Sequence, residues 1–287
     1  MRPSNHVHKA ALPFILSLLD VSKEQLYAQG IDAQELVVIY NDYTTRLDEL
    51  EDLAILVATN LKRQENVHAL RYRVKEPLHL LKKIIRKKEE YPDRHLNSGN
   101  YLQYINDLVG VRILHLYKED CTAIGDFIKQ HWELKREPYA YVDDKRTSEA
   151  IKFTSGKYKV LVNDRGYKAQ HFILKVKPSR QQYFVEVQVK TLFEEGWSEV
   201  DHCIRYPDHK PNTLLNRLLW LLNELTANAD AVATQIQALA EELHKYQHNP
   251  KITTAQLRSH IDMLPVDEQE KQFLYTCLAK LTDSEKP

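Results

Sequence analysis

The sequence has little of several things that mark well-known classes of protein. Its three cysteines, Cys121, Cys203 and Cys277, are far apart and form no CxxC pair, so neither a structural zinc site nor a disulfide framework is expected. Its seven glycines include no GxxxxGK[ST] run, which excludes a P-loop kinase. Lys and Arg number 40, as do Asp and Glu, so no global field draws the chain to nucleic acid or to an anionic membrane. A polyanion must therefore bind at a local cluster of cations.

The apolar stretch at residues 10–19 is too short to span a membrane. It is followed by Asp20, Lys23 and Glu24, without the small-residue cleavage site of an export signal. We interpret it as a helix that docks on the rest of the protein. Together with the cysteine content, this favours a protein of the reducing cytoplasm.

Two long helices are predicted from apolar residues that recur in alternating steps of four and three. The first runs from Leu36 to Leu61, and the second covers residues 212–246. Each apolar stripe needs a partner surface, which is either the protein's own core or a second copy in a homo-oligomer. Residues 252–281 are expected to form two short helices that break around Pro265.

Between the long helices the apolar pattern changes to the alternation of strands. We predict strands at 108–116, 158–163, 168–176 and 183–190. A helix is expected around residues 126–130, and the polar stretch 135–157 is interpreted as a long loop. The middle of the chain is therefore an α/β (α+β) unit.

Three segments follow from these elements. They are an N-terminal docking segment, a central domain and a C-terminal helical extension, at residues 1–35, 36–210 and 211–287.

The strand at 183–190 has an apolar face and a face that carries Glu186 and Gln188. A solvent-facing strand has the same pattern, so a functional interpretation needs companion segments elsewhere in the sequence that could contribute residues to the same site. One companion is Tyr167 with His171, which share a face of a strand that starts after a glycine turn. Such a pair is commonly structural, but it can also stack on a base and contact a phosphate or hydroxyl group.

A second companion is the basic segment around a predicted helix that starts at Pro77. Arg73 and Lys75 precede this helix, and Lys83 and Arg86 share one of its faces. These donors could converge on a polyphosphate, although a Lys-rich helix is usually only a solvated surface. The buried stripe of this helix is predicted to comprise Leu78, Leu81 and Ile85.

A third companion is Asp107, which enters the apolar strand at 108–116 and can act as a strand cap or as a metal ligand. Arg112 interrupts the same strand five residues later. In a regular strand these two side chains would face opposite ways. Both can contact one nucleotide only if the strand twists or if Asp107 lies on the preceding turn.

Taken in order, these segments resemble the synthetase domain of the RelA/SpoT family, which makes the alarmones pppGpp and ppGpp. The landmarks are Arg-Val-Lys at 73–75, Asp-Leu-Val-Gly-Val-Arg at 107–112, Gly-Tyr-Lys-Ala-Gln-His at 166–171 and Glu-Val-Gln-Val-Lys-Thr at 186–191. The resemblance spans about residues 36–206 and is closest to a small, stand-alone alarmone synthetase. It implies a nucleotidyltransferase-like mixed β-sheet flanked by helices, with two nucleotides in one cleft.

The resemblance also implies a reaction, in which the 3′-hydroxyl of GDP or GTP attacks the β-phosphorus of ATP and AMP leaves. Asp107 and Glu186 would bind Mg²⁺, and Glu186 would help to deprotonate the hydroxyl. Arg73 and Arg112 would sandwich the adenine of ATP. The other implied ATP contacts are Lys75, Lys83 and Arg86. The implied acceptor contacts are Tyr167, His171 and Gln188.

Several positions depart from the family pattern, namely Tyr72, His79, Asn163 and Glu195. Asn163 stands where a lysine often contacts the acceptor, which weakens the case for free GDP or GTP. One alternative is therefore a toxin-like family member that pyrophosphorylates an adenine nucleotide or the 3′ end of tRNA. A tRNA acceptor would need a basic surface beyond the cleft, such as Lys82, Lys87, Lys88, Arg136 and Lys152.

An alternative of another class is a catalytically idle module that binds nucleotides or a partner through its long helices. The presence of both Asp107 and Glu186 beside basic residues argues against it.

Overall fold

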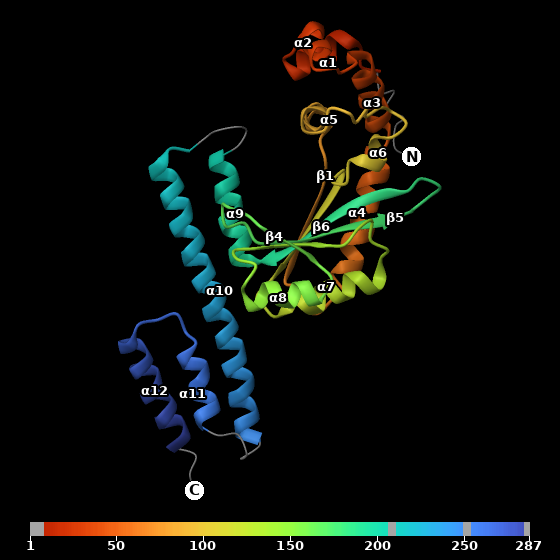
Figure 1. Cartoon of the computed structure of the whole chain (residues 1–287). Helices are drawn as coiled ribbons and strands as arrows, with labels where there is room; N and C mark the ends of the chain where they lie inside the picture. Colours follow the sequence, from red (N-terminus) through yellow and green to blue (C-terminus); the bar gives the residue numbers. More distant parts are fainter. Residues whose placement is uncertain (1–8, 206–210, 249–253, 284–287) are drawn as a thin grey trace.

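The computed structural model describes residues 9–205, 211–248 and 254–283, and its centre is a mixed six-stranded sheet (Figure 1). The strand order is β1-β2-β6-β5-β3-β4. The central pair, β2 and β6, is parallel, and β1 and β5 flank it in antiparallel orientation. The strands are β1 (Ala69–Val74), β2 (Val109–His115), β3 (Tyr139–Val142), β4 (Lys159–Val162), β5 (Ala169–Val176) and β6 (Tyr183–Thr191).

All four predicted strands are present, and two strands were not predicted. The interpretation of residues 135–157 as a long loop was wrong, because this stretch contains β3 and the helix α8 (Ser148–Ser155). The Thr147 side chain accepts a hydrogen bond from the backbone of Ala150 and caps α8. The edge strand β1 was missed as well.

One face of the sheet is apolar and is covered by helices. Val185, Val187 and Val189 of β6 are buried on this face. They belong to the same core as side chains of α4 (Leu47–Leu61) and α7 (Asp120–His131). The opposite face keeps polar side chains at alternate positions, because successive residues of a strand point to opposite sides.

The first long helix is divided where the prediction made it continuous. Residues Ala33–Thr45 form α3, and α4 begins after a turn at Arg46. The Arg46 guanidinium contacts Asp42 at 2.9 Å and also reaches the Tyr183 hydroxyl at the start of β6. The break therefore coincides with a tertiary contact, which the apolar spacing does not record.

The N-terminal docking helix is confirmed as α1 (Leu12–Leu19), which with α2 (Lys23–Ala28) packs against α3 and α5 (Figure 1). The helix α5 (Pro77–Glu90) begins at Pro77, as predicted. Its most buried residues are Leu80, Leu81 and Ile84, which corrects the predicted stripe at two of three positions. A short helix, α6 (Tyr101–Tyr104), lies just before the residues that lead into β2.

The C-terminal half of the chain is helical. The helix α9 (Leu192–Arg205) follows β6 directly, and α10 (Thr213–His248) confirms the second long helix. As predicted, two shorter helices follow, α11 (Thr254–Asp262) and α12 (Glu268–Asp283), and they form a separate small core with the far part of α10 (Figure 1). None of the helices in the described ranges is both long and apolar enough to cross a membrane. The predicted boundary at residue 210 lies outside the described residues, and the division into domains stays a prediction.

Candidate active site

The polar face of the sheet carries a continuous row of side chains at one level across all its strands. Paired residues of neighbouring strands point to the same face, so the register defines this row. From the β1 edge to the β4 edge, the row comprises Arg71, Arg112, Gln188, His171, Tyr139 and Lys159. The next level contains Arg73, Gly110 and Glu186. Charged and aromatic groups from distant parts of the chain are thereby aligned.

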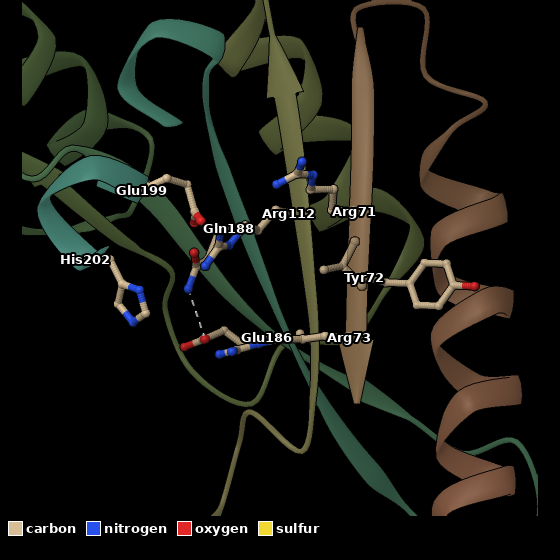
Figure 2. A pocket seen from close by; sticks show the side chains of 10 residues that line it. Arg71, Tyr72, Arg73, Arg112, Glu186, Gln188, Glu199 and His202 are labelled. Carbon is tan, nitrogen blue, oxygen red and sulfur yellow. Dashed lines mark hydrogen bonds and ion pairs between the residues drawn. The ribbon is translucent and has the colours of Figure 1, made fainter. Parts of the chain in front are cut away.

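A cleft of about 400 Å³ lies over the β1, β2 and β6 part of this face. This volume is within the range of small-molecule sites. Figure 2 shows Glu186 and Gln188 pointing toward Glu199 and His202 of α9, while the Tyr72 ring points away from them. The lining residues are Arg71, Tyr72, Arg73, Gly110, Val111, Arg112, Glu186, Gln188, Glu199 and His202.

Asp107 lies on the segment before β2, as one of the two predicted alternatives required, and two lysines hold it. Its Oδ2 atom is 3.0 Å from Lys75 Nζ and 2.7 Å from Lys83 Nζ. Burial raises the pKa of Asp107, but the two ammonium groups outweigh it and keep the pKa below its ordinary value. The Oδ1 atom is buried and has no hydrogen-bond partner among the described residues. Asp107 is therefore an ionised carboxylate with one unused oxygen.

Glu186 is the second carboxylate of the site. It lies 3.7 Å from His171 Nδ1, and it accepts a hydrogen bond of 3.2 Å from Gln188. Burial and the charge of Asp107 raise the pKa of Glu186, while His171 and Lys83 lower it to a net value below the ordinary one. Asp107 and Lys83 both act on Glu186, so the two carboxylates share one electrostatic environment.

Arg112 is already occupied by carboxylates. Its Nη1 atom contacts Glu195 at 2.9 Å and also contacts Glu199. Glu195 in turn lies 3.1 Å from the buried Lys190. The helix α9, which supplies both glutamates, begins with a capping box in which Thr191 and Glu194 exchange hydrogen bonds.

Three rings gather beside Glu186 on the β5 side. The Tyr167 hydroxyl is 2.8 Å from His171 Nε2, and the Tyr141 ring stands edge-on to both rings at 5.5 Å and 5.1 Å. Lys190 Nζ lies 4.9 Å from the centre of the Tyr167 ring. Burial raises the pKa of Tyr167, so its hydroxyl stays protonated. This cluster offers an aromatic surface next to hydrogen-bonding groups.

Comparison with known proteins agrees with this geometry. Residues 72–211 match the family described as the region found in RelA / SpoT proteins. This central region of the chain belongs to the RelA/SpoT family. No curated protein matches the sequence significantly.

Two solved structures show the same fold as this chain. Small alarmone synthetase 1 from Bacillus subtilis has 15% identity and a TM-score of 0.51, over 70% of this chain and 98% of that one. A GTP pyrophosphokinase family protein from Streptococcus pneumoniae has 13% identity and a TM-score of 0.50, over 72% of this chain and 96% of that one. These identities are low, so the likeness is one of fold, and it confirms the mixed sheet flanked by helices.

The residues singled out by the RelA/SpoT resemblance fall into three neighbouring groups and one outlier. Arg73, Arg112, Glu186 and Gln188 line the cleft, Asp107 joins Lys75 and Lys83, and Tyr167 joins His171. The outlier is Arg86, whose largely exposed side chain pairs with Glu90 at 3.4 Å.

The sequence-based search missed three residues of this site, Arg71, Tyr141 and Glu199. Arg71 precedes the predicted Arg73 by two positions, so recognising the strand β1 would have found it. The other two had no signal, because Tyr141 was assigned to a loop and Glu199 depends on how α9 packs.

Proposed function

We propose that this protein transfers a pyrophosphoryl group from ATP to the 3′-hydroxyl of GDP or GTP and releases AMP. The observation that carries the proposal is the pairing of Asp107 with Glu186. Asp107 precedes β2 and Glu186 lies on β6, the charge of Asp107 acts on Glu186, and Lys83 influences both carboxylates beside a nucleotide-sized cleft. Two ionised carboxylates that are both influenced by one lysine suit a metal-assisted phosphoryl transfer.

Mg²⁺ is the metal that the donor set fits. The unused Oδ1 atom of Asp107 is a buried carboxylate oxygen, and Glu186 supplies a second carboxylate nearby. Mg²⁺ prefers oxygen ligands and commonly binds one or two carboxylates together with substrate phosphates. When bound there, the ion would neutralise negative charge on the transferred phosphates.

The donor nucleotide is assigned to the β1, β2 and α5 side of the site. Arg73 and Arg112 line the cleft there, and planar guanidinium groups stack well on an adenine ring. Lys75 and Lys83 would contact the phosphates of ATP, since both reach the Asp107 corner of the site. Arg86 would have to leave Glu90 to join them.

The acceptor nucleotide is assigned to the β5 side. The Tyr167 ring would stack on its base, and His171 and Gln188 would orient its ribose near Glu186. The lowered pKa of Glu186 keeps it ionised at neutral pH, so it can accept a hydrogen bond from the 3′-hydroxyl. Proximity and alignment then account for most of the catalysis.

Chromatography of the products from ATP, Mg²⁺ and a panel of acceptors tests the proposal. With GDP or GTP we expect AMP and a guanosine tetra- or pentaphosphate. Glu186→Gln should abolish both products while the unfolding midpoint stays near the wild-type value. Tyr167→Ala should mainly raise the KM for the acceptor.

Two other outcomes would redirect the assignment. If AMP forms only with tRNA or an adenine nucleotide, the protein is a toxin-like member of the family. If purified, folded protein forms no product with any acceptor, the idle-module interpretation is correct.

A further inference from the structure

The row of side chains across the polar face does not end at the cluster of Tyr141, Tyr167 and His171, which we call the acceptor cluster. Beyond His171 it continues to Tyr139 on β3 and Lys159 on β4. Arg136, which precedes β3, covers the Tyr139 ring with its guanidinium carbon 4.5 Å from the ring centre. Lys159 Nζ lies 5.6 Å from the same centre. Two cations are thus placed on one aromatic ring at this edge of the site.

These two cations differ from the others near the acceptor cluster. Lys168 is neutralised by Asp143 at 2.6 Å, and Lys190 by Glu195 at 3.1 Å. Neither Arg136 nor Lys159 has an acidic partner within ion-pair distance in the part of the chain that the structure describes. Their charge is therefore available to an anion.

The edge cations are electrostatically connected to the rest of the site. The Tyr141 ring touches the Tyr167 and His171 rings, and it follows Tyr139 by two positions on the same face of β3. Burial and the charge of Glu186 raise the pKa of Tyr141, whereas Arg136 lowers it. The charges of Glu186 and Arg136 therefore both act on Tyr141.

The stereochemistry of a nucleotide points toward the same edge. A ribose carries its 3′-oxygen and its 5′-carbon on opposite sides of the sugar ring. With the 3′-oxygen at Glu186 on β6 and the base on Tyr167, the 5′ side can extend across β5 toward β3 and β4. Neighbouring strands lie roughly 4.8 Å apart, so β3 is about 10 Å from β6, which is within reach of a 5′-phosphate.

We propose that Arg136 and Lys159, held on the Tyr139 ring, bind the phosphate on the 5′ side of the acceptor nucleotide. This inference rests on the proposed function, because it takes the acceptor's base on Tyr167 and its 3′-hydroxyl at Glu186. Arg binds a phosphate as a fork and Lys as a point charge, so the pair can hold two oxygens of one group. The phosphate comes either from a mononucleotide's 5′-diphosphate or from the phosphodiester before a 3′-terminal nucleotide.

Calorimetric titration of the full-length protein tests this inference without requiring turnover. Wild type and the double variant Arg136→Ala/Lys159→Ala are titrated with GDP, with guanosine and with a dinucleotide that has a free 3′-hydroxyl. A matched control, Lys177→Ala/Arg180→Ala, removes two exposed charges from the β5–β6 connection. All four substituted residues are exposed, so both double variants should fold.

We expect the double variant Arg136→Ala/Lys159→Ala, called the edge variant, to lose roughly tenfold or more in affinity for a ligand that carries the phosphate. Guanosine affinity and ATP affinity should stay at wild-type values, and the control should bind every ligand normally. Loss confined to GDP identifies the 5′-diphosphate as the source, and loss confined to the dinucleotide identifies the phosphodiester. Equal affinity of wild type and edge variant for both phosphate-bearing ligands overturns the inference.

Product formation separates this inference from the proposed function. Suppose that wild type forms a guanosine tetraphosphate, while the edge variant keeps the wild-type KM for GDP and the wild-type binding of both phosphate ligands. Then the proposed reaction is correct, and only the phosphate site at Arg136 and Lys159 is wrong. If wild type binds GDP through Arg136 and Lys159 but forms no product with any acceptor, the edge site stands and the proposed reaction fails.

Discussion

Arg112 provides a sharp test of the donor site, because it has two competing roles. The structure ties its guanidinium to Glu195 and Glu199, whereas the proposed reaction requires the same group to stack on the adenine of ATP. ATP must therefore displace or reorganise an ion pair when it binds. Removing one glutamate charge should make that step easier, and the two glutamates should respond differently because their burial differs.

The Glu199 side chain is 41% exposed, so solvent screens its pairing with Arg112. An exposed ion pair contributes about 0.5–1 kcal/mol, which corresponds to a roughly two- to fivefold change in binding. Glu199→Gln should therefore lower the KM for ATP by about two- to fivefold. Its effect on stability should be small.

Glu195 is only 6% exposed, and it also neutralises Lys190, whose side chain is 2% exposed. Glu195→Gln leaves a buried ammonium group without a carboxylate, at an expected loss of about 3–5 kcal/mol in the free energy of unfolding. In this variant the loss of unfolding free energy should be more evident than any change in the KM for ATP.

The assay is the KM for ATP at saturating acceptor, measured together with urea unfolding. Glu51→Gln, an exposed glutamate on α4, is the matched control and should leave both quantities unchanged. A higher KM for ATP in Glu199→Gln would show that this glutamate helps ATP to bind. Equal unfolding midpoints for the Glu195 and Glu199 variants would refute the distinction between their environments.

Three further predictions follow from other contacts. Asp107→Asn should abolish product formation and also lower the urea midpoint, because Lys75 and Lys83 lose the carboxylate between them, whereas Glu186→Gln should lose activity alone. Asn223→Ala removes the donor to the Gly166 carbonyl just before Tyr167, so the KM for the acceptor should rise by roughly 3- to 10-fold with little change in kcat. Burial raises the pKa of Glu194 to about 7 from an ordinary 4.5, so its contribution to stability is complete below pH 4.5 and is lost as the pH rises through 7. One pKa unit is worth about 1.4 kcal/mol, so wild type should lose at most about 3.5 kcal/mol of unfolding free energy between about pH 4.5 and pH 7. In urea unfolding, Glu194→Gln should not show this loss.

The sequence predicted the elements whose apolar pattern is long and regular. The strands β2, β5 and β6 alternate over seven to nine residues, and α10 keeps its spacing throughout. By contrast, β3 has four residues inside a polar stretch, and β1 is an edge strand that carries Arg71 and Arg73. The strand β4 is equally short and also lies at an edge, but its run Val-Leu-Val made it recognisable, whereas the arginines of β1 and the polar surroundings of β3 hid the apolar pattern.

The candidate site could likewise be predicted only in part from the sequence. The spacing of Asp107 to Arg112 left two possibilities, a twisted strand or a place for Asp107 on the preceding turn, and the structure has the second. The ion pairs of Arg112 could not be predicted, since Glu195 and Glu199 lie 83 and 87 residues away in the chain. They depend on how α9 docks, and docking depends on the three-dimensional packing of several elements.

The geometry of the carboxylate pair depends on the register of the two central strands. Because β2 and β6 are parallel neighbours, Gly110 lies opposite Glu186, and Asp107 on the segment before β2 acts on Glu186 through its charge. A slip of β6 by one residue would turn Glu186 and Gln188 into the core and expose its valines. Val185, Val187 and Val189 oppose that slip, since each is at most 1% exposed and full burial of such a side chain is worth about 1.5–3 kcal/mol. The apolar face of β6 therefore holds the reactive face in position, and substitutions at these valines should impair catalysis through the placement of Glu186.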